Sequence, residues 1–228
     1  MTKMLSVAEH FHSVQGEGVH AGTSMHFIRL AGCNVGRPPN NMDPAYWTSR
    51  PEFPILKTGR EAWRCHTYDG RGFWCDTDFQ KGTPMDMRTL VDATWEDHIC
   101  ITGGEPLLHH KDLSELIEMA AAKMKFVHIE TSGTVDWTPD PCWLTCSPKI
   151  GFLPRMVDQA DEIKLLIDDG FDIAKVPTCI MQHPTVFIQP VNHELTLDQR
   201  NIEICRDILR REPHWRLSIQ MHKAINWR

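Results

Sequence analysis

The sequence lacks any hydrophobic run long enough to cross a membrane, because none of its apolar stretches approaches the ~20 residues that a transmembrane helix needs. Residues 1–4 are not followed by the apolar segment of a secretory signal. Low-complexity tracts and internal repeats are also absent. Of the 228 residues, 41% are hydrophobic, which is ample for one continuous core. We therefore expect a single cytoplasmic domain over residues 1–228 with no membrane partner.

The chain also lacks a surplus of positive charge, with 24 Lys and Arg against 30 Asp and Glu and a net charge of -6. A nucleic-acid platform requires excess Lys and Arg on at least one face. The 13 histidines include no pair four residues apart of the kind that marks a helical zinc-hydrolase motif. These absences favour a small-molecule substrate and no nucleic-acid partner.

What the sequence does have is eight cysteines, without the close spacing of a small secreted scaffold. Such cysteines indicate metal ligands and buried thiols in a reducing compartment. Cys33 follows an apolar run, and a loop of about forty residues then carries Cys65 and ends near Cys75. Soft thiolates select zinc, Cu(I) or iron–sulfur clusters, and a four-iron cluster held by three cysteines keeps one iron free. Three thiols on one loop therefore predict a metal site.

Hydrophobic periodicity predicts an α/β fold. Strand-like runs occur at residues 25–30, 98–102, 126–130, 143–146, 162–167, 186–189 and 216–220. A helix is predicted over residues 87–95. Two helical stripes follow, formed by Leu113, Leu116, Ile117, Ala120, Ala121 and Met124, and by Ile202, Cys205, Ile208 and Leu209. Strands joined by helical links imply parallel βαβ units. The prolines and glycines of residues 34–72 exclude a regular helix or a central strand there.

Polar groups follow the strands. They stand at Cys33, Gly103-Gly104, Thr131, Ser147-Pro148-Lys149, Gln189 and Gln220. In a parallel α/β barrel the carboxyl ends of the strands meet at one mouth, where active sites are built. Ordinary loop polarity is the alternative explanation.

Eight motifs in a fixed order resemble the 7-carboxy-7-deazaguanine synthases, a family of radical S-adenosylmethionine enzymes. They are Gln15-Gly16-Glu17-Gly18, residues 27–34, Trp74-Cys75-Asp76-Thr77, Thr102-Gly103-Gly104-Glu105-Pro106, residues 129–133, Ser147-Pro148-Lys149, Gln189-Pro190 and residues 215–220. The resemblance implies a partial, incomplete parallel β/α barrel with a cluster-binding loop insertion at about 34–72, and a homodimer. The implied reaction is a ring contraction of 6-carboxy-5,6,7,8-tetrahydropterin to 7-carboxy-7-deazaguanine with release of ammonia, with flavodoxin or ferredoxin as electron donor.

The resemblance also implies roles for individual residues. A 4Fe-4S cluster would be held by Cys33, Cys65 and Cys75, and Mg²⁺ by Thr77. The S-adenosylmethionine site would comprise Trp74, Cys75, Asp76, Gly104, Ser147, Pro148, Lys149, Gln189, Pro190, Val191 and Asn192. The pterin site would comprise Val14, Gln15, Gly16, Arg29, Thr102 and the terminal carboxylate of Arg228. An arginine suits a carboxylate because its planar fork donates two parallel hydrogen bonds.

The sequence departs from the family pattern at the middle cysteine. That ligand usually stands three positions before the last one, where this chain has Gly72, and another common position holds Arg37. Cys65 is the nearest candidate. The alternative is that His66 is the ligand and Cys65 does not bind the cluster. Two other functions stay open: a different radical enzyme such as a glycyl-radical activase, and a non-catalytic module stapled by zinc on Cys33, Cys65, Cys75 and His66.

Overall fold

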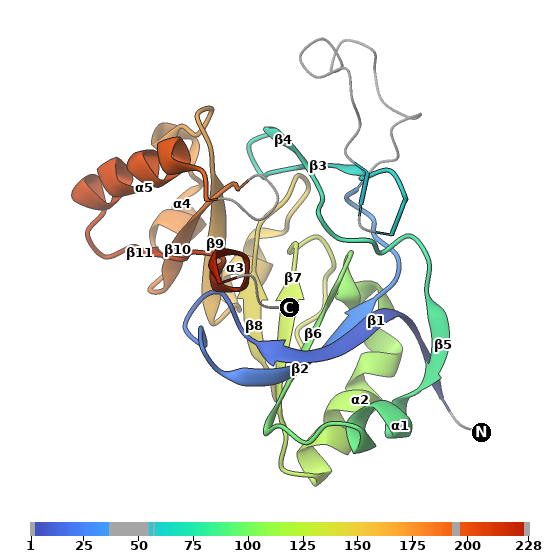
Figure 1. The fold of residues 1–228 in the computed structure, drawn as a ribbon. Helices are drawn as coiled ribbons and strands as arrows, with labels where there is room; N and C mark the ends of the chain where they lie inside the picture. Colours follow the sequence, from blue (N-terminus) through green and yellow to red (C-terminus); the bar gives the residue numbers. More distant parts are fainter. Residues whose placement is uncertain (1–2, 37–54, 57, 193–196, 226–228) are drawn as a thin grey trace.

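The computed structural model describes residues 3–36, 55–56, 58–192 and 197–225. Its central feature is a nine-stranded sheet in the order β11-β10-β9-β8-β7-β6-β2-β1-β5 (Figure 1). From β2 to β11 every neighbouring pair is parallel. The predicted α/β class and parallel sheet are therefore confirmed.

The parallel strands lie close to the predicted positions. They are β2 Ser24–Leu30, β6 His98–Gly103, β7 Phe126–Thr131, β8 Trp143–Cys146, β9 Glu162–Ile167, β10 Val186–Pro190 and β11 Arg216–Leu217. These runs are rich in Ile, Val and Leu because both faces of the sheet are covered. Only β11 is shorter than predicted, since its pairing with β10 stops after Leu217 apart from one further bond, Ser218 N–H to Ile188 C=O at 2.9 Å.

Two antiparallel strands at one edge were not predicted: β1 Met4–Val14 and β5 Thr83–Asp86. The sequence of β1 carries few consecutive apolar residues, and His10 and His12 are exposed. Pairing with β2 makes β1 a strand. In Figure 1, β1 and β2 pass in front of β6–β8, so the sheet curls into an incomplete barrel.

Most of the helices lie outside this curled sheet, and the last one lies beside the loop after β1 (Figure 1). They are α1 Met87–Asp92, α2 His110–Ala122, α3 Pro154–Asp158, α4 Thr178–Met181, α5 Gln199–Arg211 and α6 Met221–Ala224, with short 3-10 turns at Pro106–His109 and Ile173–Lys175. The helix predicted over 87–95 ends early, at Asp92. Leu113, Leu116, Ile117 and Ala120 form the buried stripe of α2. Met124 was wrongly placed in that stripe, because it follows the helix and is 87% exposed. No helix in the described part of the chain is long and apolar enough to span a membrane.

The expected insertion contains a small hairpin rather than only loop. Strands β3 Arg64–His66 and β4 Gly72–Trp74 pair antiparallel in a separate two-stranded sheet. The described part of 34–72 contains no regular helix and no strand of the central sheet, as predicted. Arg37 lies outside the described residues. Figure 1 places the hairpin above the carboxyl ends of β6 and β7.

Candidate functional site at the barrel mouth

Hairpin β3–β4 presents two of the expected cluster cysteines on one face. Cys65 pairs with Phe73, and the Cys75 N–H bonds to the Trp63 carbonyl at 2.9 Å, which continues the same register. Cys75 stands two residues after Phe73, so its side chain points to the same side of the ribbon. Diagonal neighbours of this kind are about 7–8 Å apart. A hairpin thus brings together two thiols that are ten positions apart in sequence.

Cys33 lies at the end of β2, against the glycine turn that follows β6. Its sulfur accepts backbone N–H groups of Val35 and Gly36, both at 3.4 Å. Gly104 packs so closely that a Cβ there would lie 2.6 Å from Cys33 Cβ and 2.2 Å from the Gly32 oxygen. Only glycine fits this contact, which lets the turn after β6 pack directly against Gly32 and Cys33.

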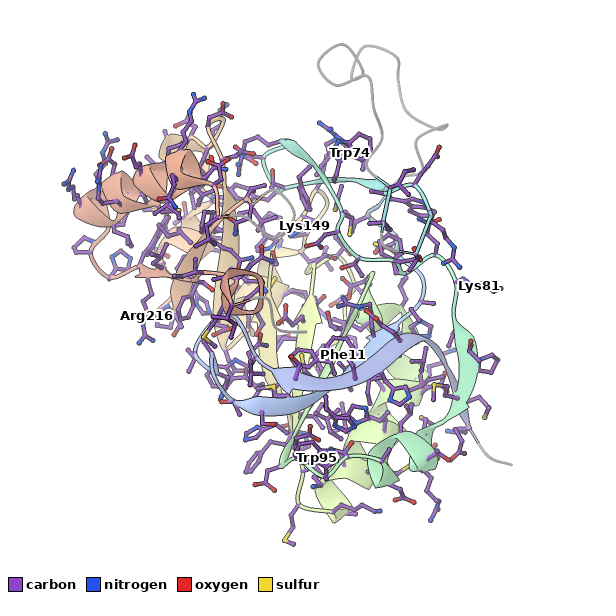
Figure 2. All side chains as sticks on the ribbon, viewed as in Figure 1. Phe11, Trp74, Lys81, Trp95, Lys149 and Arg216 are labelled. Carbon is purple, nitrogen blue, oxygen red and sulfur yellow. The ribbon has the colours of Figure 1, made fainter. Side chains whose placement is uncertain are left out.

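Electrostatics indicate that the three thiols share one region. Burial raises the pKa of Cys75 to about 12, and the neighbouring charges of Asp76, Cys65 and Cys33 add to the shift. Burial lowers the pKa of Lys149, while the charges of Cys65 and Cys75 oppose that change. The Lys149 ammonium also lies 5.5 Å from the Phe73 ring centre. Figure 2 shows Lys149 at the mouth below Trp74, whereas Trp95 lies at the opposite end of the barrel.

This donor set fits an iron–sulfur cluster. Thiolates on a four-iron cluster bind different iron atoms, so they surround the cluster rather than a single ion. Within the described ranges, no three His, Cys, Asp or Glu side chains form a group that could hold one metal ion. A nearby ammonium and backbone N–H groups directed at sulfur offset the negative charge that such a cluster brings.

Next to the thiols, a buried charge network lines the barrel interior. The Lys164 ammonium of β9 bonds to Glu17 and, at 2.7 Å, to Glu130 of β7. Gln15 donates to Glu130 at 3.1 Å. The side chains of Lys164, Glu17 and Glu130 are 7%, 11% and 22% exposed. Burial lowers the pKa of Lys164, but the charges of Glu130 and Glu17 outweigh burial and hold it above its ordinary value.

Glu17 also joins the loop after β1 to the far side of the barrel. It accepts hydrogen bonds from Gln189 at 3.2 Å and Gln220 at 2.9 Å. Asn192 donates to Gln220 at 3.4 Å. The backbone of the same loop is held as well, since Met221 N–H bonds to the Gly16 carbonyl at 3.1 Å. The loop therefore crosses the open side of the incomplete barrel.

Arg29 links the substrate residues to the expected magnesium residue. It stands on β2 in register with Thr102 of β6. Its Nε donates to Glu9 at 2.9 Å and its Nη1 to the Thr77 hydroxyl at 3.3 Å. The ion pair with Glu9 fixes the guanidinium, and the Arg29 side chain is only 19% exposed. Arg29, Thr102 and Thr77 are thus brought together.

The remaining expected residues lie around the same mouth. Lys149 donates to the Ser147 carbonyl at 2.9 Å and hydroxyl at 2.7 Å, and Pro148 between them is buried. Val191 N–H bonds to the Ile167 carbonyl at 2.8 Å, directly after β10. The Arg64 guanidinium lies 5.1 Å from the Trp74 ring centre. Val14 ends β1, Asp76 is exposed, and Arg228 lies outside the described residues.

Sequence reasoning gave no role to three residues that organise this site: Lys164, Arg71, and Glu105, which was named only as part of a motif. Glu105 is fully buried and accepts from Leu107 N–H at 3.0 Å, the Thr131 hydroxyl at 2.9 Å and Ser132 N–H at 2.8 Å. A charged residue inside an apolar run, such as Lys164 in residues 162–167, was the available signal. A buried charge is retained only where partners satisfy it.

The curled parallel sheet, with thiols, amides and paired charges at the carboxyl ends of its strands, defines an enzyme of the partial α/β-barrel class. No family model matches the chain. A 7-carboxy-7-deazaguanine synthase from Bordetella pertussis is 32% identical over 237 residues, covering 96% of this chain and 97% of its own length. One from Bacteroides thetaiotaomicron is 31% identical over 228 residues, covering 99% and 100%.

A solved structure agrees with these relatives. The crystal structure of QueE from Escherichia coli has a TM-score of 0.64 and 25% identity, and the match covers 96% of this chain and 95% of that one. The chain belongs to the 7-carboxy-7-deazaguanine synthase family. The predicted family and partial-barrel fold are thereby confirmed.

Proposed function

We infer that this chain converts 6-carboxy-5,6,7,8-tetrahydropterin to 7-carboxy-7-deazaguanine, with release of ammonia. The inference is carried by membership of this family, together with Cys33 against the glycine turn at Gly104 and Cys65 and Cys75 on one face of hairpin β3–β4. When bound, the cluster and S-adenosylmethionine would supply the 5′-deoxyadenosyl radical that starts the reaction. The protein's own residues bind, orient and shield the reactants.

We propose Cys65, rather than His66, as the middle cluster ligand. The hairpin register supports it, because Cys65 shares a face with Phe73 and Cys75 while His66 alternates to the other face. The charge coupling of Cys65 with Cys75 and Lys149 supports it too. In this arrangement the hairpin brings Cys65 and Cys75 onto one face, although the chain lacks the short cysteine spacing of the family pattern.

The S-adenosylmethionine residues would surround the free iron. The Gly104 backbone would receive the methionine amino group, with Trp74 and Asp76 beside the cluster. The segment Ser147-Pro148-Lys149 follows β8, and Gln189-Pro190-Val191-Asn192 spans the end of β10, on the other side of β9. These two segments would hold the rest of the cofactor. Gln189 is 3% exposed and already bonded to Glu17, so it ties the cofactor side to the substrate side.

The pterin would bind between β1, β2 and β6. Arg29 suits its carboxylate, since the guanidinium is held at Nε by Glu9. Val14, Gln15, Gly16, Thr102 and the terminal carboxylate of Arg228 would contact the ring. We place Mg²⁺ at Thr77, because a hard ion needs few protein ligands and borrows substrate oxygens. The 3.3 Å contact between Arg29 and Thr77 supports a shared site.

The proposed partners are a second copy of the chain, in a homodimer, and a flavodoxin or ferredoxin that delivers the electron. The proposed location is the cytoplasm, where such donors and a reducing environment occur together. The pterin substrate is a small molecule, as the charge balance of the sequence also predicts.

The function is tested with anaerobically reconstituted protein, a chemical reductant, S-adenosylmethionine, Mg²⁺ and the carboxypterin. We expect deazaguanine product by mass spectrometry and a brown colour that fades in air. Cys65→Ala should abolish both, whereas His66→Ala and Cys179→Ala should retain the colour. Colourless protein with one tightly held zinc per chain would support the stapled binding module instead. Cofactor cleavage without any pterin product would support another radical enzyme.

A further inference from the structure

The tip of hairpin β3–β4 is a tight turn that ends in a partly buried arginine, Arg71. Thr67 N–H bonds to the Arg71 carbonyl at 2.9 Å and Gly70 N–H to the Thr67 carbonyl at 3.0 Å. Gly70 has a φ of 86°, which glycine adopts without strain. Asp69, within this turn, is only 4% exposed in its side chain. The Asp69 side chain therefore packs against the protein, while Gly70 is exposed.

Arg71 connects this turn to the carboxyl end of β9. Its Nε donates to Asp69 at 2.8 Å, its Nη1 to Asp168 at 2.6 Å, and its Nη2 to the Leu166 carbonyl at 2.9 Å. The guanidinium also lies 5.3 Å from the Phe171 ring centre. A planar fork with several fixed donors is suited to such a junction, and lysine cannot reproduce it. The Arg71 side chain is 13% exposed, so these contacts are shielded from solvent.

A second attachment of the hairpin is a short stretch of backbone. Thr67 forms a β-bridge with Lys149, and Ile150 N–H bonds to the His66 carbonyl at 3.2 Å. An isolated two-stranded hairpin is marginally stable in water. The backbone contact follows β8 and the Arg71 contact follows β9, so together they fix the hairpin at two points.

We propose that Arg71 is a positioning residue for the cluster: by tying hairpin β3–β4 to the end of β9, it sets where Cys65 and Cys75 stand relative to Cys33. The proposal rests on the proposed function, because it assumes that these thiols hold the cluster. The same junction borders the cofactor segment, since the Ile167 carbonyl of β9 accepts the Val191 N–H. Loss of Arg71 should therefore loosen the cluster site first.

The test compares Arg71→Met, Arg71→Lys and Asp168→Asn with a matched control, Arg200→Met. Arg200 pairs with Asp169 at 3.5 Å, next to the junction, but the two side chains are 76% and 63% exposed. An exposed pair contributes little to stability. The readouts are iron and sulfide per chain after reconstitution, and the rate at which an iron chelator removes the cluster under argon. Neither readout requires substrate or turnover.

We expect the chelator to remove the cluster about 10- to 100-fold faster from Arg71→Met, the range found when residues that orient metal ligands are lost. Arg71→Lys and Asp168→Asn should be intermediate, and Arg200→Met should match the wild type. Circular dichroism of the apo-proteins checks folding, and the two milder variants decide the question if Arg71→Met does not fold. Wild-type loss rates in all folded Arg71 and Asp168 variants would overturn the proposal. Absence of an oxygen-sensitive cluster in the wild type would instead overturn the proposed function.

Discussion

Replacing Lys164 by methionine should destabilise the protein strongly, because the ammonium neutralises two buried carboxylates. Lys164, Glu17 and Glu130 are all under a quarter exposed, and both acids bond to the same nitrogen. Removing one partner of a buried ion pair costs about 3–5 kcal/mol, since the other charges stay buried without compensation. For a chain of this size each kcal/mol lowers Tm by about 2–4 °C, so Tm should fall by roughly 6–20 °C.

The assay is urea unfolding at pH 8, followed by circular dichroism, with a double-mutant cycle. Glu17→Gln combined with Lys164→Met removes one positive and one negative charge, so the double variant should be more stable than the sum of the single changes predicts.

The network should also matter for substrate binding. Glu130 accepts the Gln15 amide at 3.1 Å, and Gln15 is a proposed pterin residue. In folded Lys164→Met we expect KM for the pterin to rise more than the Kd of S-adenosylmethionine changes. A loss of less than 1 kcal/mol at pH 8, together with strictly additive single and double variants, would refute the reasoning that Lys164 compensates both acids.

Three further outcomes follow from local geometry. Gly104→Ala should weaken S-adenosylmethionine binding at least tenfold by calorimetry, because a Cβ would lie 2.2 Å from the Gly32 oxygen and 2.6 Å from Cys33 Cβ. Iron loading should become more favourable as pH rises from 6.5 to 8.5, with proton release, because burial raises the pKa of the Cys75 thiol to about 12 and binding requires the thiolate. Burial lowers the pKa of His26 to about 4, so the unfolded chain binds an extra proton below its ordinary pKa. Stability should therefore fall as pH drops from 6.5, by about 2 kcal/mol at pH 5 from this residue, and His26→Gln should flatten that part of the curve.

Each of these outcomes can be contradicted by experiment, and the histidine outcome has a control variant. His214→Gln changes an exposed histidine, with 51% of its side chain accessible, and should leave the acid limb of the stability curve unchanged. Equal acid sensitivity in His26→Gln and wild type would contradict the burial argument. Iron loading that is independent of pH would mean that the thiols are already ionised in the apo-protein. Unchanged cofactor affinity in Gly104→Ala would show that the turn can shift.

Sequence patterns were enough to predict the parallel strands, most of the two helical stripes and the family. Residues 143–146 and 162–167 coincide with β8 and β9, because hydrophobic periodicity records which side chains are buried. The sequence also marked the three thiols on one loop as candidate metal ligands. It marked the glycine pair after a strand as part of a candidate site. The prolines and glycines of residues 34–72 likewise predicted that this loop holds no central strand.

The arrangement of the thiols and the contacts that hold the barrel mouth together could not be predicted from local sequence. The hairpin that puts Cys65 beside Cys75 depends on a register that no periodicity encodes. The Arg71–Asp168 contact joins residues 97 positions apart, and the Gln220–Glu17 contact joins residues 203 apart. Strand β1 likewise exists because β2 and β5 pair with it, despite its mixed polarity. Local sequence reports burial and turn preference, whereas these contacts form only after the sheet has curled and brought distant segments within bonding distance.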